Sequence, residues 1–248
     1  FICREIRESD GSDCFHRFDP SATGPAVMPW TEWEYFQTTG DLDRLKRVYP
    51  VLAAFHWWMR AYRTWPDGSY WATGWACGMD NQPRLPAGES REWYHGHLSW
   101  IDTCLQQAFS AGLLARMAAI LGRGAEADGF KNELESLRDY VNGKMWDSGT
   151  SFYRDRGPDG TLSKVKTIGA YWALLAEAVP DDRLDGFLAH LESPEEFNRP
   201  HRVPSLSADD PQYKADGGYW LGGVWPPTNY MVLRGLSRAG RPRPASTL

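Results

Sequence analysis

The chain has 248 residues, of which 42% are hydrophobic, and this is enough for the core of one large domain. Its formal net charge is -5 and it has no run of basic residues, which argues against nucleic acid or an anionic membrane as a partner. No segment approaches the roughly 20 apolar residues of a membrane span. We also find no signal peptide and no disulfide framework, and these absences favour a cytoplasmic location.

Helices are predicted in chain order wherever apolar residues recur at steps of three and four. The predicted helices are residues 29–39, 41–64 with Asp41 as N-cap and a kink at Pro50, 94–121, 125–142, 167–178, 182–192 and 227–238. Short strands are predicted at 69–72 and 150–154, and long loops at 65–93, 146–166 and 193–226. We therefore expect an all-α domain of paired helices whose loops gather at one end and carry the site.

The predicted helix 94–121 is apolar on nearly every side, yet Ser99, Asp102, Gln106 and Ser110 form one polar stripe along it. A polar stripe on a buried helix must face partners, either other protein groups or a wet pocket. Asp102 and Gln106 are therefore either a hydrogen-bonded core pair or ligands for sugar hydroxyl groups.

Asp80 is a lone carboxylate in the aromatic stretch "WATGWACGMDNQPR". One interpretation is a turn aspartate that caps a backbone amide. The other is a general acid, because walls such as Trp71 and Trp75 raise the pKa of a carboxyl group by desolvation. Arg84 would oppose this effect if it lay close to Asp80.

Two further stretches combine aromatic and polar residues. The stretch "PWTEWEY" places Trp30 and Trp33 either at the end of an amphipathic helix or on a pocket wall. The glycines of "GGYWLGGVWPPTNY", residues 217–230, allow the backbone to approach a ligand closely. With 13 Trp and 11 Tyr in the chain, this pattern favours a ligand with apolar faces and hydroxyl edges, such as a sugar.

The sequence indicates neither a metal site nor a cofactor. His95 and His97 lack an evident third ligand, and the glycines of residues 217–223 are not followed by the Lys-Ser/Thr of a phosphate loop. Cys3, Cys14, Cys77 and Cys104 form no C-x-x-C pair, so we expect buried thiols.

Three motifs in this order resemble the catalytic domain of glycoside hydrolase family 63 and its mannosylglycerate-hydrolase-like members, which are related to the family 37 trehalases. They are "GMDNQPR" (78–84), "SWIDTCLQQA" (99–108) and "GGYWLGGVWPPTNYMVLRGL" (217–236). The stretches "FICREI", "MPWTEWEYFQTTGD" and "YRTWPDGSYWATG" are similar to the first helical hairpins of the family.

The resemblance implies an (α/α)6 toroid over residues 1–238, followed by a flexible C-terminal tail at 239–248. It also implies an inverting, exo-acting α-glycoside hydrolase of the α-glucosidase or α-mannosidase type, acting on a small sugar conjugate or oligosaccharide, with Asp80 as general acid. Residues implied to line the sugar pocket are Trp30, Trp33, Trp71, Trp75, Tyr219, Trp220 and Trp225. Residues implied to bind hydroxyl groups or orient the acid are Asn81, Arg84, Asp102, Gln106 and Asn229.

The sequence departs from the family pattern in its general base. The family places this glutamate in a W-E-N-Y-like stretch after the "WPPTNY" motif, and none follows here. The predicted helices are also too few for six hairpins, so we expect an incomplete toroid that a missing segment or another chain completes.

Three explanations stay open for the missing base. The chain is a fragment of a longer enzyme, or an inactive relative that still binds sugar, or Glu32 or Glu34 acts as base. The alternative class of function is a carbohydrate-binding helical toroid without catalysis.

Overall fold

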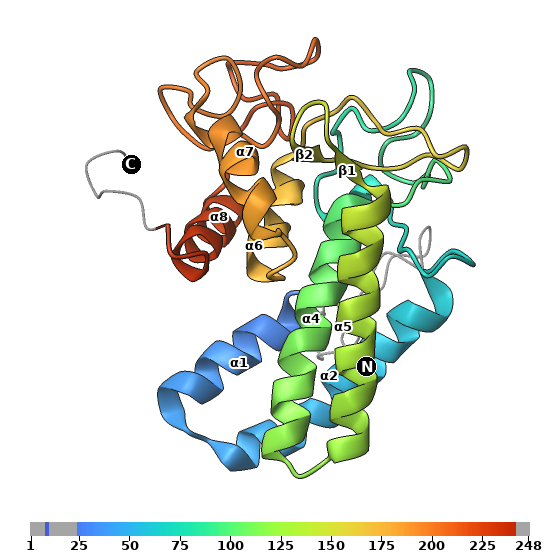
Figure 1. Cartoon of the computed structure of the whole chain (residues 1–248), viewed down its shortest axis with the longest axis vertical. Helices are drawn as coiled ribbons and strands as arrows, with labels where there is room; N and C mark the ends of the chain where they lie inside the picture. The colour runs from blue at the N-terminus through green and yellow to red at the C-terminus, as the bar shows by residue number, and fades with distance from the viewer. Residues whose placement is uncertain (1–7, 10–23, 242–248) are drawn as a thin grey trace.

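The computed structural model describes residues 8–9 and 24–241 of the chain (Figure 1). The predicted motif "FICREI", Cys3, Cys14 and residues 242–248 of the predicted tail lie outside the described residues.

Helices dominate the described part of the chain, which confirms the prediction of an all-α domain. The α-helices are α1 (Met28–Thr39), α2 (Leu42–Tyr62), α3 (Gly74–Cys77), α4 (Ile101–Ile120), α5 (Gly124–Lys144), α6 (Trp172–Leu175), α7 (Asp181–Glu192) and α8 (Pro226–Arg238), and the 3-10 helix η1 (Ile168–Tyr171) precedes α6. The strands β1 (Trp146–Asp147) and β2 (Phe152–Tyr153) pair antiparallel, with Trp146 opposite Tyr153. No helix in these described ranges is long and apolar enough to cross a membrane.

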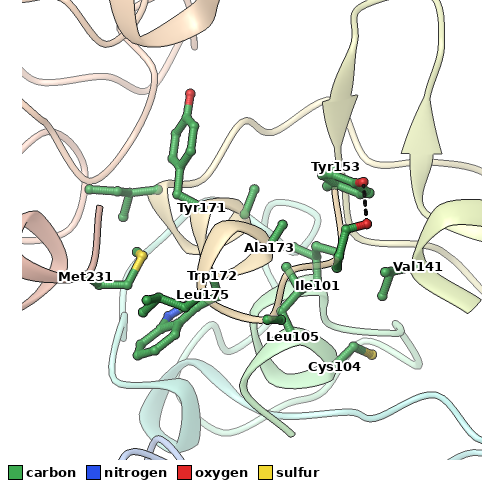
Figure 2. Close-up of a cluster of buried hydrophobic side chains, with 14 of the residues drawn as sticks. Ile101, Cys104, Leu105, Val141, Tyr153, Tyr171, Trp172, Ala173, Leu175 and Met231 are labelled. Atoms are coloured by element: carbon green, nitrogen blue, oxygen red, sulfur yellow. Dashed lines mark hydrogen bonds between the residues drawn. The ribbon is translucent and has the colours of Figure 1, made fainter. Parts of the chain in front are cut away.

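Helix α4 is the centre of the molecule, and 16 of its 20 residues are buried. The amphipathic α5 runs beside it and buries Phe130, Leu137 and Val141 (Figure 1). On another side of α4, the side chains of η1, α6 and α8 complete a core around Ile101 and Trp172 (Figure 2). The apolar sequence of α4 thus follows from contacts with neighbours on several sides.

Helices α1 and α2 form a hairpin with defined ends. Helix α1 has Pro29 in its first turn and ends at Gly40, whose φ of 68° suits a residue without a side chain. Helix α2 has the predicted N-cap, because the side chain of Asp41 accepts a hydrogen bond of 2.8 Å from the backbone N–H of Arg44. Pro50 lies inside α2.

The long connections gather at one end of the helices, as predicted (Figure 1). The first joins α2 to α4, the second contains β1 and β2 and leads to η1, and the third joins α7 to α8. Backbone hydrogen bonds link these connections to one another: Ser205 N–H donates to the carbonyl of Gly223 at 3.0 Å, and Ile168 N–H to that of Ser205 at 3.1 Å. This end of the molecule is therefore one connected layer of loops.

Three of the predicted helices and strands differ from the structure. Helix α4 begins at Ile101 rather than near residue 94, because Gly96 and His97 adopt φ angles of 61° and 54°, which a right-handed helix cannot include. The predicted helix 167–178 is shorter and divided into η1 and α6. The predicted strand 69–72 is a single bridge between Tyr70 and Thr64, whereas β2 lies within the other predicted strand.

Candidate active site

Asp80 lies just after the short helix α3, in a tightly packed turn. Thr73 caps α3 by accepting a hydrogen bond of 3.1 Å from Ala76 N–H, and Gly78 ends it with a φ of 78°. A Cβ atom at Gly74 would collide with the backbone carbonyls of Asp80 and Arg91, so only glycine fits there. The glycines of "TGWACGMD" thus set the position of the half-buried Asp80.

The carboxylate of Asp80 has one hydrogen-bond partner among the described residues. The hydroxyl group of Tyr219 donates to Oδ2 at 2.9 Å, while Oδ1 has no partner in this part of the chain. Partial burial, and then the hydrogen bond to Asp80, raise the pKa of the Tyr219 phenol. Tyr219 therefore stays protonated and donates at neutral pH.

Asn81 joins the Asp80 turn to the loop that carries Tyr219. Its side-chain amide donates to the carbonyl of Gly218 at 3.1 Å, and its Oδ1 accepts from the N–H of Trp220 at 3.0 Å. Both ends of the amide are thus bound to backbone on either side of Tyr219. Of the two predicted roles for Asn81, this geometry favours orienting the acid over binding a hydroxyl group.

A cavity of about 600 Å³ is bounded by α1, α3, α4, η1, α6, α8 and the loop before α8. Its lining consists of Pro25, Val27, Trp30, Thr31, Glu34, Cys77, Gly78, Met79, Gln106, Gly169, Trp172, Trp220, Pro227, Thr228 and Tyr230. Asp80 and Tyr219 are not among these lining residues, so the expectation that Tyr219 lines the sugar pocket is corrected. Their neighbours in sequence do line it: Gly78 and Met79 precede Asp80, and Trp220 follows Tyr219. The volume and the mainly apolar wall suit a small ligand such as a sugar.

Two polar groups of this wall have unused hydrogen-bonding capacity. The side-chain amide of Gln106 has no hydrogen-bond partner among the described residues, and neither has the buried indole N–H of Trp220. Buried polar groups are normally satisfied, so an unpaired amide and N–H at a cavity wall are what a bound hydroxyl group would complete. The polar stripe on α4 therefore faces the cavity at Gln106.

The other predicted aromatic residues contribute to different surroundings. Trp33 lines a neighbouring cavity of about 390 Å³, which shares Trp30 and Glu34 with the first. Trp75 stacks on Trp93 with ring centroids 5.0 Å apart. The expectation that Trp33 and Trp75 line the sugar pocket is thus corrected, because Trp33 lines the neighbouring cavity and Trp75 stacks on Trp93.

Trp71 and Trp225 likewise lie outside the wall of the 600 Å³ cavity. The guanidinium group of Arg63 lies 4.4 Å from the ring centroid of Trp71, whereas Trp225 stacks on Trp220 at 4.3 Å. Asn229 forms hydrogen bonds to both backbone groups of Val203. Trp225 and Asn229 therefore support the loop rather than face the cavity.

Arg84 and Asp102 form a buried ion cluster with Asp155, which the sequence did not indicate. Arg84 donates to both carboxylate oxygens of each aspartate at 2.6–2.9 Å, and its guanidinium group lies 4.0 Å from the ring centroid of Trp100. Burial opposes the charge of Arg84, but the two aspartates raise its pKa by more. Arg84 is thus paired with Asp102 and Asp155 and not with Asp80. This corrects the expectation that Arg84 and Asp102 bind sugar hydroxyl groups or orient the acid. Among the described residues, Asp102 also forms no hydrogen bond with Gln106, so these two are not a core pair.

The two glutamates considered as a base lie in different surroundings. Glu32 is buried and bound to Arg44 at 2.8 Å. Glu34 lies on the cavity wall, where it accepts hydrogen bonds from Trp30, Tyr230 and Arg234 at 2.7–3.0 Å. Of the two, only Glu34 reaches the cavity.

The described residues hold no group of three His, Cys, Asp or Glu side chains arranged for a metal ion. The rings of His95 and His97 lie 4.7 Å apart and pack against Trp65. Cys77 and Cys104 are buried free thiols, as predicted.

Comparison with protein families relates this geometry to known proteins. Residues 17–248 match the model of the mannosylglycerate hydrolase MGH1-like glycoside hydrolase domain. The chain belongs to this family. The resemblance found in the three motifs is thereby confirmed.

Two curated relatives match most of the chain. An uncharacterized protein of Borreliella burgdorferi is 27% identical over 218 residues, which are 88% of this chain and 44% of the relative. A probable mannosyl-oligosaccharide glucosidase of Schizosaccharomyces pombe is 25% identical over 223 residues, 86% of this chain and 25% of the relative. The chain therefore spans less than half the length of either of these relatives.

A solved family member has the same fold. The family 63 mannosylglycerate hydrolase of Thermus thermophilus, crystallised with glucose, superposes with a TM-score of 0.77 at 19% identity, over 96% of this chain and 68% of the other. This likeness confirms the predicted (α/α)6 toroid fold class. About a third of the Thermus chain has no counterpart in the match.

Proposed function

We propose that this chain carries the sugar site and the general acid of an inverting, exo-acting α-glycoside hydrolase. The observation that carries the proposal is the Asp80 carboxyl group, which has one oxygen without a partner among the described residues and directly follows Gly78 and Met79 of an aromatic cavity wall, in a chain of a glycoside hydrolase family. Asp80 donates a proton to the glycosidic oxygen as the bond to the sugar breaks. Trp30 and Trp220 contact the sugar faces, and the amide of Gln106 binds a hydroxyl group.

The names of two similar proteins support a substrate class. The fission yeast relative is named as a glucosidase of mannosyl-oligosaccharides, and the Thermus enzyme as a mannosylglycerate hydrolase. We therefore propose an α-linked glucose or mannose in a small conjugate or oligosaccharide as the substrate.

An inverting enzyme also needs an ionised carboxylate roughly 6.5 to 9.5 Å from the acid to activate water. Glu34 is the carboxylate on the cavity wall, but its oxygens already accept from Arg234, Tyr230 and Trp30. A carboxylate whose oxygens already accept from an arginine, a tyrosine and an indole N–H is poorly placed to take a proton from water. The proposal therefore names the acid and the sugar site, and it assigns none of the described residues as the base.

The paired state of Glu34 also supports a second candidate, a toroid that binds sugar without hydrolysing it. One experiment separates the two functions. The 248-residue chain is incubated with a panel of α-glucosides and α-mannosides, the anomer released is followed by NMR, and sugar binding is measured by calorimetry.

We expect the parent to release the β-anomer, and Asp80→Asn to lower kcat by about 10²- to 10⁴-fold, the usual contribution of a general acid. Asp43→Asn, at an exposed carboxylate on α2, is the matched control and keeps the parent rate. Release of the α-anomer would exclude inversion. Sugar binding without turnover would favour the second candidate.

A further inference from the structure

Tyr219, in the loop before α8, donates a hydrogen bond to the proposed acid, and its backbone is unusual. Its φ is 64°, a left-handed conformation that a residue with a bulky side chain rarely adopts. The preceding Gly217 and Gly218 also have positive φ angles, of 105° and 48°. Such a conformation persists only where the surrounding structure enforces it.

Four contacts enforce it here. Asn81, the residue after Asp80, binds the backbone on both sides of Tyr219, at Gly218 and Trp220. The indole N–H of Trp225 donates to the carbonyl of Tyr219 at 3.2 Å, and the two rings meet edge to face with centroids 5.4 Å apart. A Cβ atom at position 223 would collide with the same carbonyl, so Gly223 is needed as well.

The result of this support is a single directed hydrogen bond, from the Tyr219 hydroxyl to Oδ2 of Asp80 at 2.9 Å. A protonated carboxyl group that accepts at one oxygen carries its proton on the other. Oδ1 of Asp80 has no partner among the described residues, so the proton is available there for transfer.

We propose that Tyr219 is the positioning residue of the general acid, which places the proton of Asp80 on Oδ1 and binds the carboxylate left after transfer. This inference rests on the proposed function. The proton passes from Oδ1 to the glycosidic oxygen as the bond from that oxygen to the sugar C1 breaks. A water oxygen bonds to C1 from the opposite face and gives its proton to a carboxylate base. Tyr219 keeps its proton throughout.

The first test compares leaving groups. A substrate with a poor leaving group needs the acid, whereas a dinitrophenyl glycoside does not. Tyr219→Phe should lower kcat by about 10- to 100-fold for the first substrate and change it by less than about threefold for the second, as a partial loss of acid catalysis predicts. Tyr62→Phe, at an exposed tyrosine on α2, is the control and should change neither.

The second test needs no turnover. In protein labelled with ¹³C at the tyrosine Cζ atoms, the resonance missing from Tyr219→Phe identifies Tyr219. Its titration midpoint should fall in Asp80→Asn, because the charge and the hydrogen bond that raise the pKa of Tyr219 are gone. Arg91, which donates to the Asn81 carbonyl at 3.1 Å, and Lys214, which packs against Gly218, are unchanged in this variant.

The two tests separate the inference from the proposed function. Equal losses of kcat for both leaving groups, or an unchanged Tyr219 midpoint in Asp80→Asn, would overturn the role of Tyr219. A parent that turns over no glycoside would overturn only the proposed function, and the NMR midpoint would still decide whether Tyr219 is bound to Asp80.

Discussion

At the residue scale, His56 is a histidine that the fold keeps uncharged. It lies on α2 with 1% of its surface exposed, and its Nδ1 is 3.1 Å from the hydroxyl oxygen of Ser110 on α4. The ring of Phe130 covers it edge to face at 5.2 Å. Burial, and then the charge of Arg60, lower the pKa of His56 from 6.5 to about 3.

This shift makes the fold less stable in acid. Between pH 6.5 and pH 3 the unfolded chain binds a proton at His56 that the folded chain does not, so the free energy of unfolding falls as the pH falls. From pH 7 to pH 5 the loss due to His56 is about 2 kcal/mol. Urea unfolding at both pH values should show this loss in the parent and in His201→Gln, an exposed control, but not in His56→Gln. An equal loss in all three proteins would contradict the assignment.

At the element scale, the contact between α6 and α8 depends on Gly235. A Cβ atom there would lie 2.7 Å from the Cβ of Leu174, closer than real atoms pack. In α5, by contrast, a Cβ atom at Gly129 would meet only the ring of Trp57 at 3.9 Å, an ordinary contact.

The same substitution should therefore have opposite effects on the two helices. Gly235→Ala should lower the free energy of unfolding by about 1–3 kcal/mol through overpacking. Gly129→Ala should raise it by about 0.5–1 kcal/mol, because alanine is the better helix former. Urea unfolding measures both, and a stabilised Gly235→Ala would show that α8 moves away from α6 without cost.

At the scale of the whole molecule, the 600 Å³ cavity connects elements from both ends of the chain. Its wall takes residues from α1, α4, η1 and α8, so a ligand there holds the two halves of the chain together. A ligand that binds only the folded state stabilises it by an amount set by its concentration relative to the dissociation constant.

A sugar bound in this cavity should therefore stabilise the entire fold. At a sugar concentration 100 times the dissociation constant, the free energy of unfolding should rise by about 2.7 kcal/mol. At the same concentration, Gln106→Leu should show a smaller rise, since it loses a hydrogen bond worth about 0.5–1.5 kcal/mol. Thermal unfolding with and without sugar measures both effects. An equal rise in both proteins would place the sugar elsewhere.

Sequence periodicity predicted the longer helices because each carries its own evidence. The apolar steps of α5 and the Asp41 cap of α2 depend on residues a few positions apart. The start of α4 could not be predicted in this way, because it depends on the positive φ angles at Gly96 and His97 and on a hydrogen bond from Ser99 to the distant Arg156.

The sequence by itself determined the helical class and the family, because these depend on local patterns and on three ordered motifs. It also singled out the stretch around Asp80 as a candidate. Only the tertiary structure decided which side chains meet. It showed that Arg84 is bound to Asp102 and Asp155 rather than to Asp80, and that Tyr219 is the partner of Asp80. The reason is physical: a buried charge takes the nearest counter-charge in space, and the chain positions of Asp80 and Tyr219, 139 residues apart, give no sign that the fold brings them within 2.9 Å.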